Sequence, residues 1–169
     1  MMGKFTGAEM DAAFRRFQRV SLEAARTADY NAWADLFTED AHYVEHHFGQ
    51  MHGREAIRAW IVPLMRTYPM NHMTNYVYDR IHCDEDEGYV FFRSFTEMDD
   101  PGDGRRYAGL TWTHLEYAGD GRWSFEEDLY NPNEWQRLVL EWLEAKARGD
   151  EQAARELASG DWLRATGGG

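Results

Sequence analysis

The N-terminal part of the chain carries hydrophobic side chains at the spacing of amphipathic helices. Between residues 6 and 27, apolar side chains recur every three or four positions, and a Thr-x-x-Glu capping box opens the run. A short helix follows Asp29, and a further helix spans roughly residues 53–67. The polar stretch between these two helices is predicted to form a strand that begins after Phe37 and ends in a turn at Gly49.

From residue 71 the pattern changes to alternating apolar and polar positions with many aromatic and β-branched side chains. Short connections rich in Gly and Asp separate the alternating runs, which indicates hairpins and therefore an antiparallel meander. Helical spacing returns at Asn131 and continues to about residue 158. The four predicted strands cover residues 71–83, 89–98, 106–117 and 122–130.

Length, charge and cysteine content narrow the class of protein. With 169 residues and no linker-like stretch, the chain is expected to form one domain over residues 1–169. A net charge of −12 and the lack of a basic run argue against nucleic acid and anionic membranes as partners. Cys83 is the only cysteine, and no leader or long apolar span is evident, so a cytoplasmic protein is expected. Residues 166–169 are expected to lack regular structure.

The first predicted strand contains a high density of titratable side chains: His42, Glu45, His46 and His47. Histidine changes charge near neutral pH and a carboxylate can orient it, so this strand has the groups that an acid–base site needs. An exposed edge strand would account for the same residues. Because side chains alternate, His42 and His46 share one face and Glu45 lies on the other. The two histidines would stand ~13 Å apart, which does not favour a metal site.

The last predicted strand carries three consecutive acids among aromatic residues. If Tyr130 faces a cavity, alternation brings Asp128 and also Glu126 to the same face. A carboxyl group inside an apolar cavity would have a raised pKa and could orient a histidine or transfer a proton. The alternative is a solvated strand whose acids only add to the net charge.

The order helix, short helix, strand, helix and four-stranded meander resembles the nuclear transport factor 2-like superfamily. The strongest match is to ketosteroid isomerases, over residues 36–57, where this chain reads LFTEDA, then VEHHFGQ, then HGREAI. The chain also resembles SnoaL-like polyketide cyclases. The resemblance covers roughly residues 8–131 and implies an α+β fold: a cone-shaped, curved antiparallel sheet packed on N-terminal helices. Residues 132–160 would form a C-terminal helical extension.

Carried over residue by residue, the resemblance implies that the cone is kept and that the isomerase chemistry is not. The family's general base falls on His46 in an alignment from the C-terminal side of this motif and on Glu45 in one from the N-terminal side, because this chain has one extra residue. The family's two oxyanion donors, a tyrosine and a protonated aspartate, fall on Ser21 and Thr113.

These observations assign a candidate site. His46 is the predicted base, because a buried imidazole stays neutral and can accept a proton. Asp128 or Glu45 would orient it or act as a second acid. Neither a metal nor a cofactor is expected. The predicted substrate contacts are Tyr130, which takes the place of a pocket tryptophan in the family, and His72, Asn131 and Trp60.

The sequence therefore predicts a cofactor-independent acid–base enzyme, of dehydratase, cyclase or isomerase type. Its substrate would be a small apolar carbonyl or hydroxyl compound bound in the cone. The competing interpretation is a non-catalytic module for small-molecule binding or dimerisation, which the missing oxyanion donors favour. A homodimer is expected if Trp112 lies on the outer face of the sheet, since large apolar patches mark association surfaces.

Overall fold

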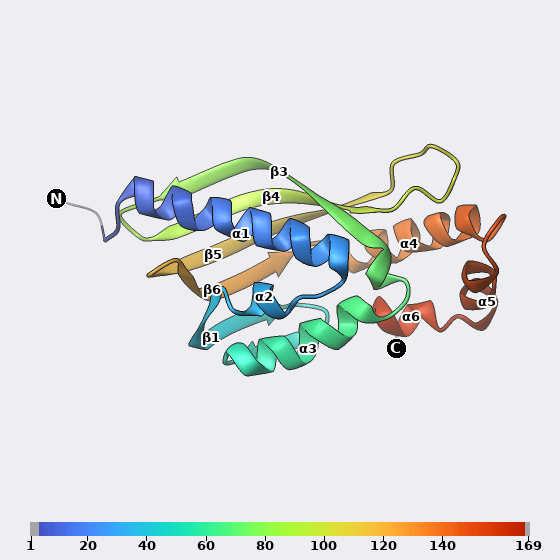
Figure 1. Cartoon of the computed structure of the whole chain (residues 1–169), viewed down its shortest axis with the longest axis horizontal. Coiled ribbons are helices and arrows are strands. Elements are labelled where there is room, and N and C mark those ends of the chain that lie inside the picture. Colours follow the sequence, from blue (N-terminus) through green and yellow to red (C-terminus); the bar gives the residue numbers. More distant parts are fainter. Residues whose placement is uncertain (1–3, 168–169) are drawn as a thin grey trace.

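A single curved sheet of six strands organises the protein, whose computed structural model describes residues 4–167 (Figure 1). The strands lie in the order β2-β1-β6-β5-β4-β3. All neighbours run antiparallel except β1 and β6, which run parallel, so the sheet is mixed. The strands are β1 (Phe37–Glu45), β2 (Gly49–His52), β3 (Met73–Asp84), β4 (Tyr89–Met98), β5 (Ala108–Gly119) and β6 (Arg122–Leu129).

The meander from β3 to β6 follows from the alternation in the sequence. In β4, every second side chain is buried, so one face of the strand packs inward and the other does not. The turns at Gly88 and Gly121 use left-handed backbone conformations that glycine adopts without strain. In β3 the register shifts between Asp79 and His82, and such a bulge bends a strand.

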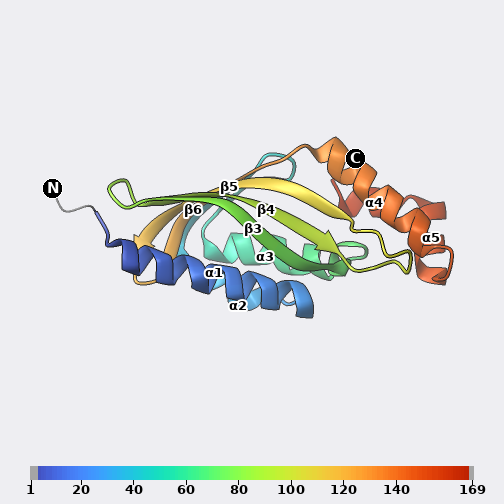
Figure 2. The same ribbon diagram turned by 90° about the horizontal axis from the view of Figure 1, so that it is seen from above.

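Three helices, α1 (Gly7–Thr27), α2 (Asn31–Ala34) and α3 (Arg54–Arg66), lie on one side of the sheet (Figure 2). Helix α1 begins where the Thr6 side chain accepts a hydrogen bond from the Glu9 amide. Its apolar stripe buries Phe14 and Phe17 against Phe92 of β4, with ring centroids 5.0 and 6.1 Å apart. The predicted α+β fold is confirmed.

The second helix is shorter than the sequence predicts. It ends at Ala34, and β1 already begins at Phe37. The Leu36 carbonyl accepts a hydrogen bond from the amide of Trp123, the second residue of β6. Pairing with β6 therefore draws this segment into the sheet, and tertiary hydrogen bonding overrides the helical spacing of the side chains.

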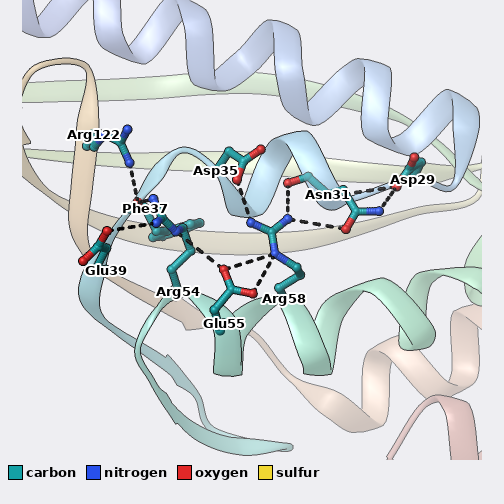
Figure 3. A network of polar contacts seen from close by, with 9 residues as sticks. All are labelled: Asp29, Asn31, Asp35, Phe37, Glu39, Arg54, Glu55, Arg58 and Arg122. Atoms are coloured by element: carbon teal, nitrogen blue, oxygen red, sulfur yellow. Dashed lines mark hydrogen bonds and ion pairs between the residues drawn. The ribbon is translucent and has the colours of Figure 1, made fainter.

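An exposed polar network fixes α2 against α3 (Figure 3). Arg58 donates to the Asn31 carbonyl at 2.8 Å and to the Asp35 carboxylate at 2.6 Å, and it also contacts Glu55 on its own helix. Arg54, one turn earlier, contacts Glu39 of β1 at 3.5 Å. These contacts hold α3, and with it the inward side chains of that helix, against α2 and β1.

Three further helices, α4 (Pro132–Lys146), α5 (Glu151–Ser159) and α6 (Trp162–Ala165), lie at one end of the sheet (Figures 1 and 2). Trp142 of α4 is fully buried, and its indole N–H donates to the Asp99 carbonyl at 2.8 Å. Thr166 lies in a turn directly after α6, so it has no regular secondary structure, as expected, although it is only 8% exposed. Gly168 and Gly169 lie outside the described residues. None of the helices of residues 4–167 is both long and apolar enough to cross a membrane.

Helices α1 to α3 lie on one side of the sheet and leave its outer face uncovered (Figure 2). This face carries large side chains that are partly exposed. Trp112 of β5 lies there and stacks on Phe91 of β4, with ring centroids 5.2 Å apart and planes within 11°. Val77, Leu110 and Leu129 are each about 40% exposed. The sheet thus separates a packed inner face from an aromatic outer face.

Candidate functional site

A cavity of about 160 Å³ lies between the inner face of the sheet and helices α1 to α3. This volume is sufficient for a small organic molecule. Most of its wall is aromatic or aliphatic, with rings from α1, α2, α3, α4, β1, β3 and β4. Three carboxyl groups interrupt the apolar wall, on the neighbouring strands β1 and β6: Glu45, Glu126 and Asp128.

Asp128 is held by two hydroxyl groups. Tyr43 of β1 donates to Oδ2 and Thr113 of β5 donates to Oδ1, each at 2.5 Å. Burial raises the pKa of Asp128 to about 6, although both hydroxyl bonds favour the ionised form and oppose the rise. At neutral pH this carboxylate is therefore mostly ionised and only weakly solvated, which is the state of a general base.

Glu126 lies two residues earlier on the same face of β6. It is 4% exposed, and within residues 4–167 its Oε2 atom is buried with no hydrogen-bond partner. Burial, reinforced by the negative charge of Asp128, raises its pKa well above the ordinary range. This shift favours the protonated form of Glu126. Neighbouring carboxyl groups whose environments separate their pKa values are suited to act as a general acid and a general base.

Glu45 of β1 lies beside Asp128 in the sheet register. Its Oε2 atom accepts hydrogen bonds from the amides of His47, at 2.9 Å, and Phe48. These bonds close the turn between β1 and β2. The other oxygen, Oε1, is buried and has no hydrogen-bond partner among the described residues. Glu45 thus lines the cavity, as the alignment from the N-terminal side of the motif implied.

The prediction that His46 lines the cavity is wrong. β1 ends at Glu45, and His46 begins the turn, where its side chain is 57% exposed and its Nε2 lies 2.7 Å from Glu127 on the outer side of β6. The extra residue of this chain is taken up in that turn. The inward positions of β1 are those of Tyr43 and Glu45, and a shift of one residue reverses the face of every side chain.

Two of the predicted substrate contacts also lie outside the cavity. His72 Nδ1 is 2.9 Å from Asp99 Oδ2, and Lys146 of α4 binds the same carboxylate oxygen, so His72 helps to anchor the C-terminal helices. Asn131 caps α4 by accepting a hydrogen bond from the Asn133 amide at 3.1 Å. These contacts give both side chains a structural role outside the cavity. The predicted contacts Trp60 and Tyr130 do line the cavity.

Several lining residues were not identified from the sequence. Tyr43 shares the inward face of β1 with Glu45, and alternation alone could have indicated it. The hydroxyl groups of Tyr30, just before α2, and Tyr76 of β3 lie 2.8 Å apart in the cavity wall, a pairing that no local pattern predicts. Within residues 4–167, no group of three or more His, Cys, Asp or Glu side chains is arranged to hold a metal ion.

Comparisons with known proteins agree with this architecture. The fold is similar to that of a proposed isomerase from Bacillus subtilis, with a TM-score of 0.61 and 18% identity over 78% of this chain and 93% of that one. A Catenulispora acidiphila protein with a ketosteroid isomerase-like fold, in complex with trimethylamine, has a TM-score of 0.53 and 21% identity over 68% and 85%. An LEH-like epoxide hydrolase from M. tuberculosis has a TM-score of 0.55 and 16% identity over 80% and 95%.

No curated protein matches the chain in sequence. The family model of the SnoaL-like domain matches residues 15–125, which include the C-terminal part of α1, all of α2, α3 and β1 to β5, and the start of β6. The chain therefore belongs to the SnoaL-like domain family.

Proposed function

We propose that the protein is a cofactor-independent enzyme that applies general acid–base chemistry to a small apolar carbonyl or hydroxyl compound. One observation carries the proposal: two carboxyl groups on one strand, Glu126 and Asp128, lie in an apolar cavity with their pKa values displaced to different extents. Structural carboxyl groups are rarely buried without a cation, so such a pair is typical of catalytic sites.

The proposed chemistry uses Asp128 as the base and Glu126 as the acid. In a dehydration, Asp128 would remove a proton from the carbon next to a carbonyl group, and that electron pair would form the new double bond. The C–O bond to the hydroxyl group would break as Glu126 supplies the proton that makes water the leaving group. In an isomerisation, the proton would return to another carbon. Tyr43 and Thr113 would hold the Asp128 carboxylate in position throughout.

Related folds support the reaction class without fixing the reaction. A proposed isomerase and an LEH-like epoxide hydrolase are among the proteins whose fold is similar. The alternative function, a non-catalytic binding module, is favoured by one observation: the positions of the isomerase oxyanion donors hold Ser21 and Thr113. Both hydroxyl groups are already engaged, with the Phe17 carbonyl and with Asp128.

A base-catalysed ring opening tests the role of Asp128 without knowledge of the natural substrate. In 5-nitrobenzisoxazole, removal of the C–H proton breaks the N–O bond and releases a coloured cyanophenolate. At pH 7.5, we expect the wild-type protein to exceed Asp128→Asn by about 100-fold or more. Glu116→Gln, an exposed carboxyl on β5, is the matched control and should keep the wild-type rate.

The pH profile sharpens this experiment. Because the Asp128 pKa is about 6, the wild-type rate should rise about tenfold per pH unit below this value and level off above it. Equal rates for the wild-type protein and Asp128→Asn would contradict the catalytic proposal and favour the binding module.

A further inference from the structure

The side chains of the cavity that can carry a full charge at neutral pH are all acidic. The cavity contains the three carboxyl groups of Glu45, Glu126 and Asp128, and none of the described residues that line it is a lysine, arginine or histidine. Charges interact strongly where water is excluded, because the effective dielectric constant is low. The ionised carboxylates would repel an anionic ligand, whereas a cationic ligand would supply the counter-charge that the described lining residues lack.

One corner of the cavity has the composition of a cation site. Glu45 is 3% exposed, and its Oε1 atom is buried with no partner among residues 4–167. Leaving a buried carboxyl oxygen unpaired costs free energy. Aromatic rings adjoin this corner: the Trp60 ring lies 5.2 Å from that of Tyr43 and 5.9 Å from that of Phe48. The faces of such rings attract cations, most strongly when water is displaced.

The same corner also offers a hydrogen-bond donor. The Trp60 indole nitrogen is buried and has no hydrogen-bond partner in the described part of the chain. A ligand that brings a cationic nitrogen to Glu45 and an oxygen to Trp60 would satisfy both groups at once. Small amino alcohols and amino ketones have this pair of functions on neighbouring carbons.

We propose that the ligand of this cavity carries a cationic nitrogen, an ammonium or quaternary ammonium group, held between Glu45 Oε1 and the rings of Tyr43, Phe48 and Trp60. This inference names the substrate class of the proposed function and rests on it for the assignment of chemistry to Asp128 and Glu126. The charged nitrogen identifies the ligand, and its neutral part lies against the acid–base pair.

A series of ligands with one shape and three charges tests the proposal. Choline, 3,3-dimethylbutan-1-ol and 3,3-dimethylbutanoate differ in charge but share a bulky trimethyl head. In calorimetric titrations at pH 7.5, choline should bind at least about tenfold more tightly than the neutral alcohol, and the anion should not bind. Equal or tighter binding of the neutral alcohol would overturn the proposal.

Two variants locate the cation. Glu45→Gln keeps an oxygen that can accept from the turn amides, and it should abolish the preference for choline while binding of the neutral alcohol is retained. Trp60→Leu leaves Glu45 intact and should weaken choline binding severalfold, so the proposal remains testable if Glu45→Gln does not fold. Glu127→Gln, on the outer side of β6, is the control and should bind like the wild-type protein. A preference for choline that persists in both Glu45→Gln and Trp60→Leu would refute the assigned site.

The titrations separate this proposal from the catalytic one. A preference for the cation without Asp128-dependent ring opening would keep the ligand class and overturn the enzyme. Asp128-dependent ring opening without a preference for the cation would keep the enzyme and overturn the ligand class.

Discussion

Three carboxyl groups on the outer face of the sheet lie beside basic side chains, whereas those on the inner face lie among hydroxyl groups and aromatic rings. Outside, Asp79 pairs with Arg93 at 2.5 Å, Glu97 with Arg106 at 2.5 Å, and Glu127 with His46 at 2.7 Å. Inside, Glu126 and Asp128 have no cation within hydrogen-bond distance among the described residues.

The contrast is sharpest along β6, where Glu126, Glu127 and Asp128 are consecutive and alternate between the two faces. The outer acid, Glu127, is partly exposed and pairs with His46 of the turn between β1 and β2. The negative charge of Asp128 raises the pKa of Glu126, and neither inner acid has a counter-charge among the described residues, an arrangement that lowers stability. If the proposed function is right, this pair is a place where the protein loses stability in exchange for activity.

The largest expected effect is a low rate of ketosteroid isomerisation, because the inner face lacks the oxyanion donors of that reaction. We expect isomerisation of androst-5-ene-3,17-dione to be at least about 10³-fold slower than that of dedicated ketosteroid isomerases, since losing one oxyanion donor costs about 10²–10³. Ser21 and Thr113 already donate to groups of the protein. The measurement is the absorbance of the conjugated product. Turnover at the level of dedicated isomerases would show that other inner groups serve as donors.

A matched pair on β4 tests the packing of the two faces. Phe92 points inward, is 2% exposed and contacts Phe14 and Tyr78, so Phe92→Ala should lower the free energy of unfolding by about 3–5 kcal/mol. Phe91 points outward, and Phe91→Ala should cost about 1 kcal/mol in the monomer. Urea denaturation of both variants measures the difference. Equal losses would mean that the outer face is packed as tightly as the inner one.

The cost of the buried Asp128 can be measured through pH. Well below pH 4 the carboxyl group is protonated in both the folded and the unfolded chain. As the pH rises to about 6, the unfolded chain releases this proton first, so stability falls by roughly 2–3 kcal/mol and stays lower above that pH. Asparagine does not ionise. The change in the free energy of unfolding caused by Asp128→Asn should therefore be more favourable at pH 7.5 than at pH 4, by roughly 2–3 kcal/mol.

Denaturation of Asp128→Asn and the wild-type protein at both pH values tests this, and Glu116→Gln serves as the exposed control. The comparison between two pH values removes the constant effect of altered hydrogen bonds. An identical change in stability at pH 4 and pH 7.5 would indicate that Asp128 titrates like an ordinary exposed aspartate.

The outer face provides the smallest effect, a change of mass by a factor of two. We expect a homodimer that buries the aromatic outer face around Phe91 and Trp112, because exposed apolar patches of this kind mark association surfaces. Trp112→Arg should yield a monomer in light scattering at micromolar concentration, whereas Trp60→Leu in the cavity should not. A wild-type mass equal to that of one chain would contradict the expectation.

Local patterns in the sequence determined much of this protein. Helical spacing and the Thr6 cap located α1, and alternation located β3 to β6. The same period of two predicted that Asp128 and Tyr130 face the cavity together. The family motif around residues 36–57 predicted the fold. Each of these properties depends on residues that are close in sequence, which is why one chain was enough to find them.

The tertiary structure decided which face of a predicted strand points into the cavity. Alternation predicts that His46 and Glu45 point to opposite sides, but which side is inward depends on the register of β1 against β6, where Glu45 lies beside Asp128. The extra residue could lie in the strand or in the turn, and only the hydrogen bonds from the turn amides to Glu45 settle it. His72 and Thr166 likewise took their places through contacts with residues distant in sequence: Asp99 and Lys146 for one, His47 for the other. Local sequence carries no information about such partners, because the chain brings them together only when it folds.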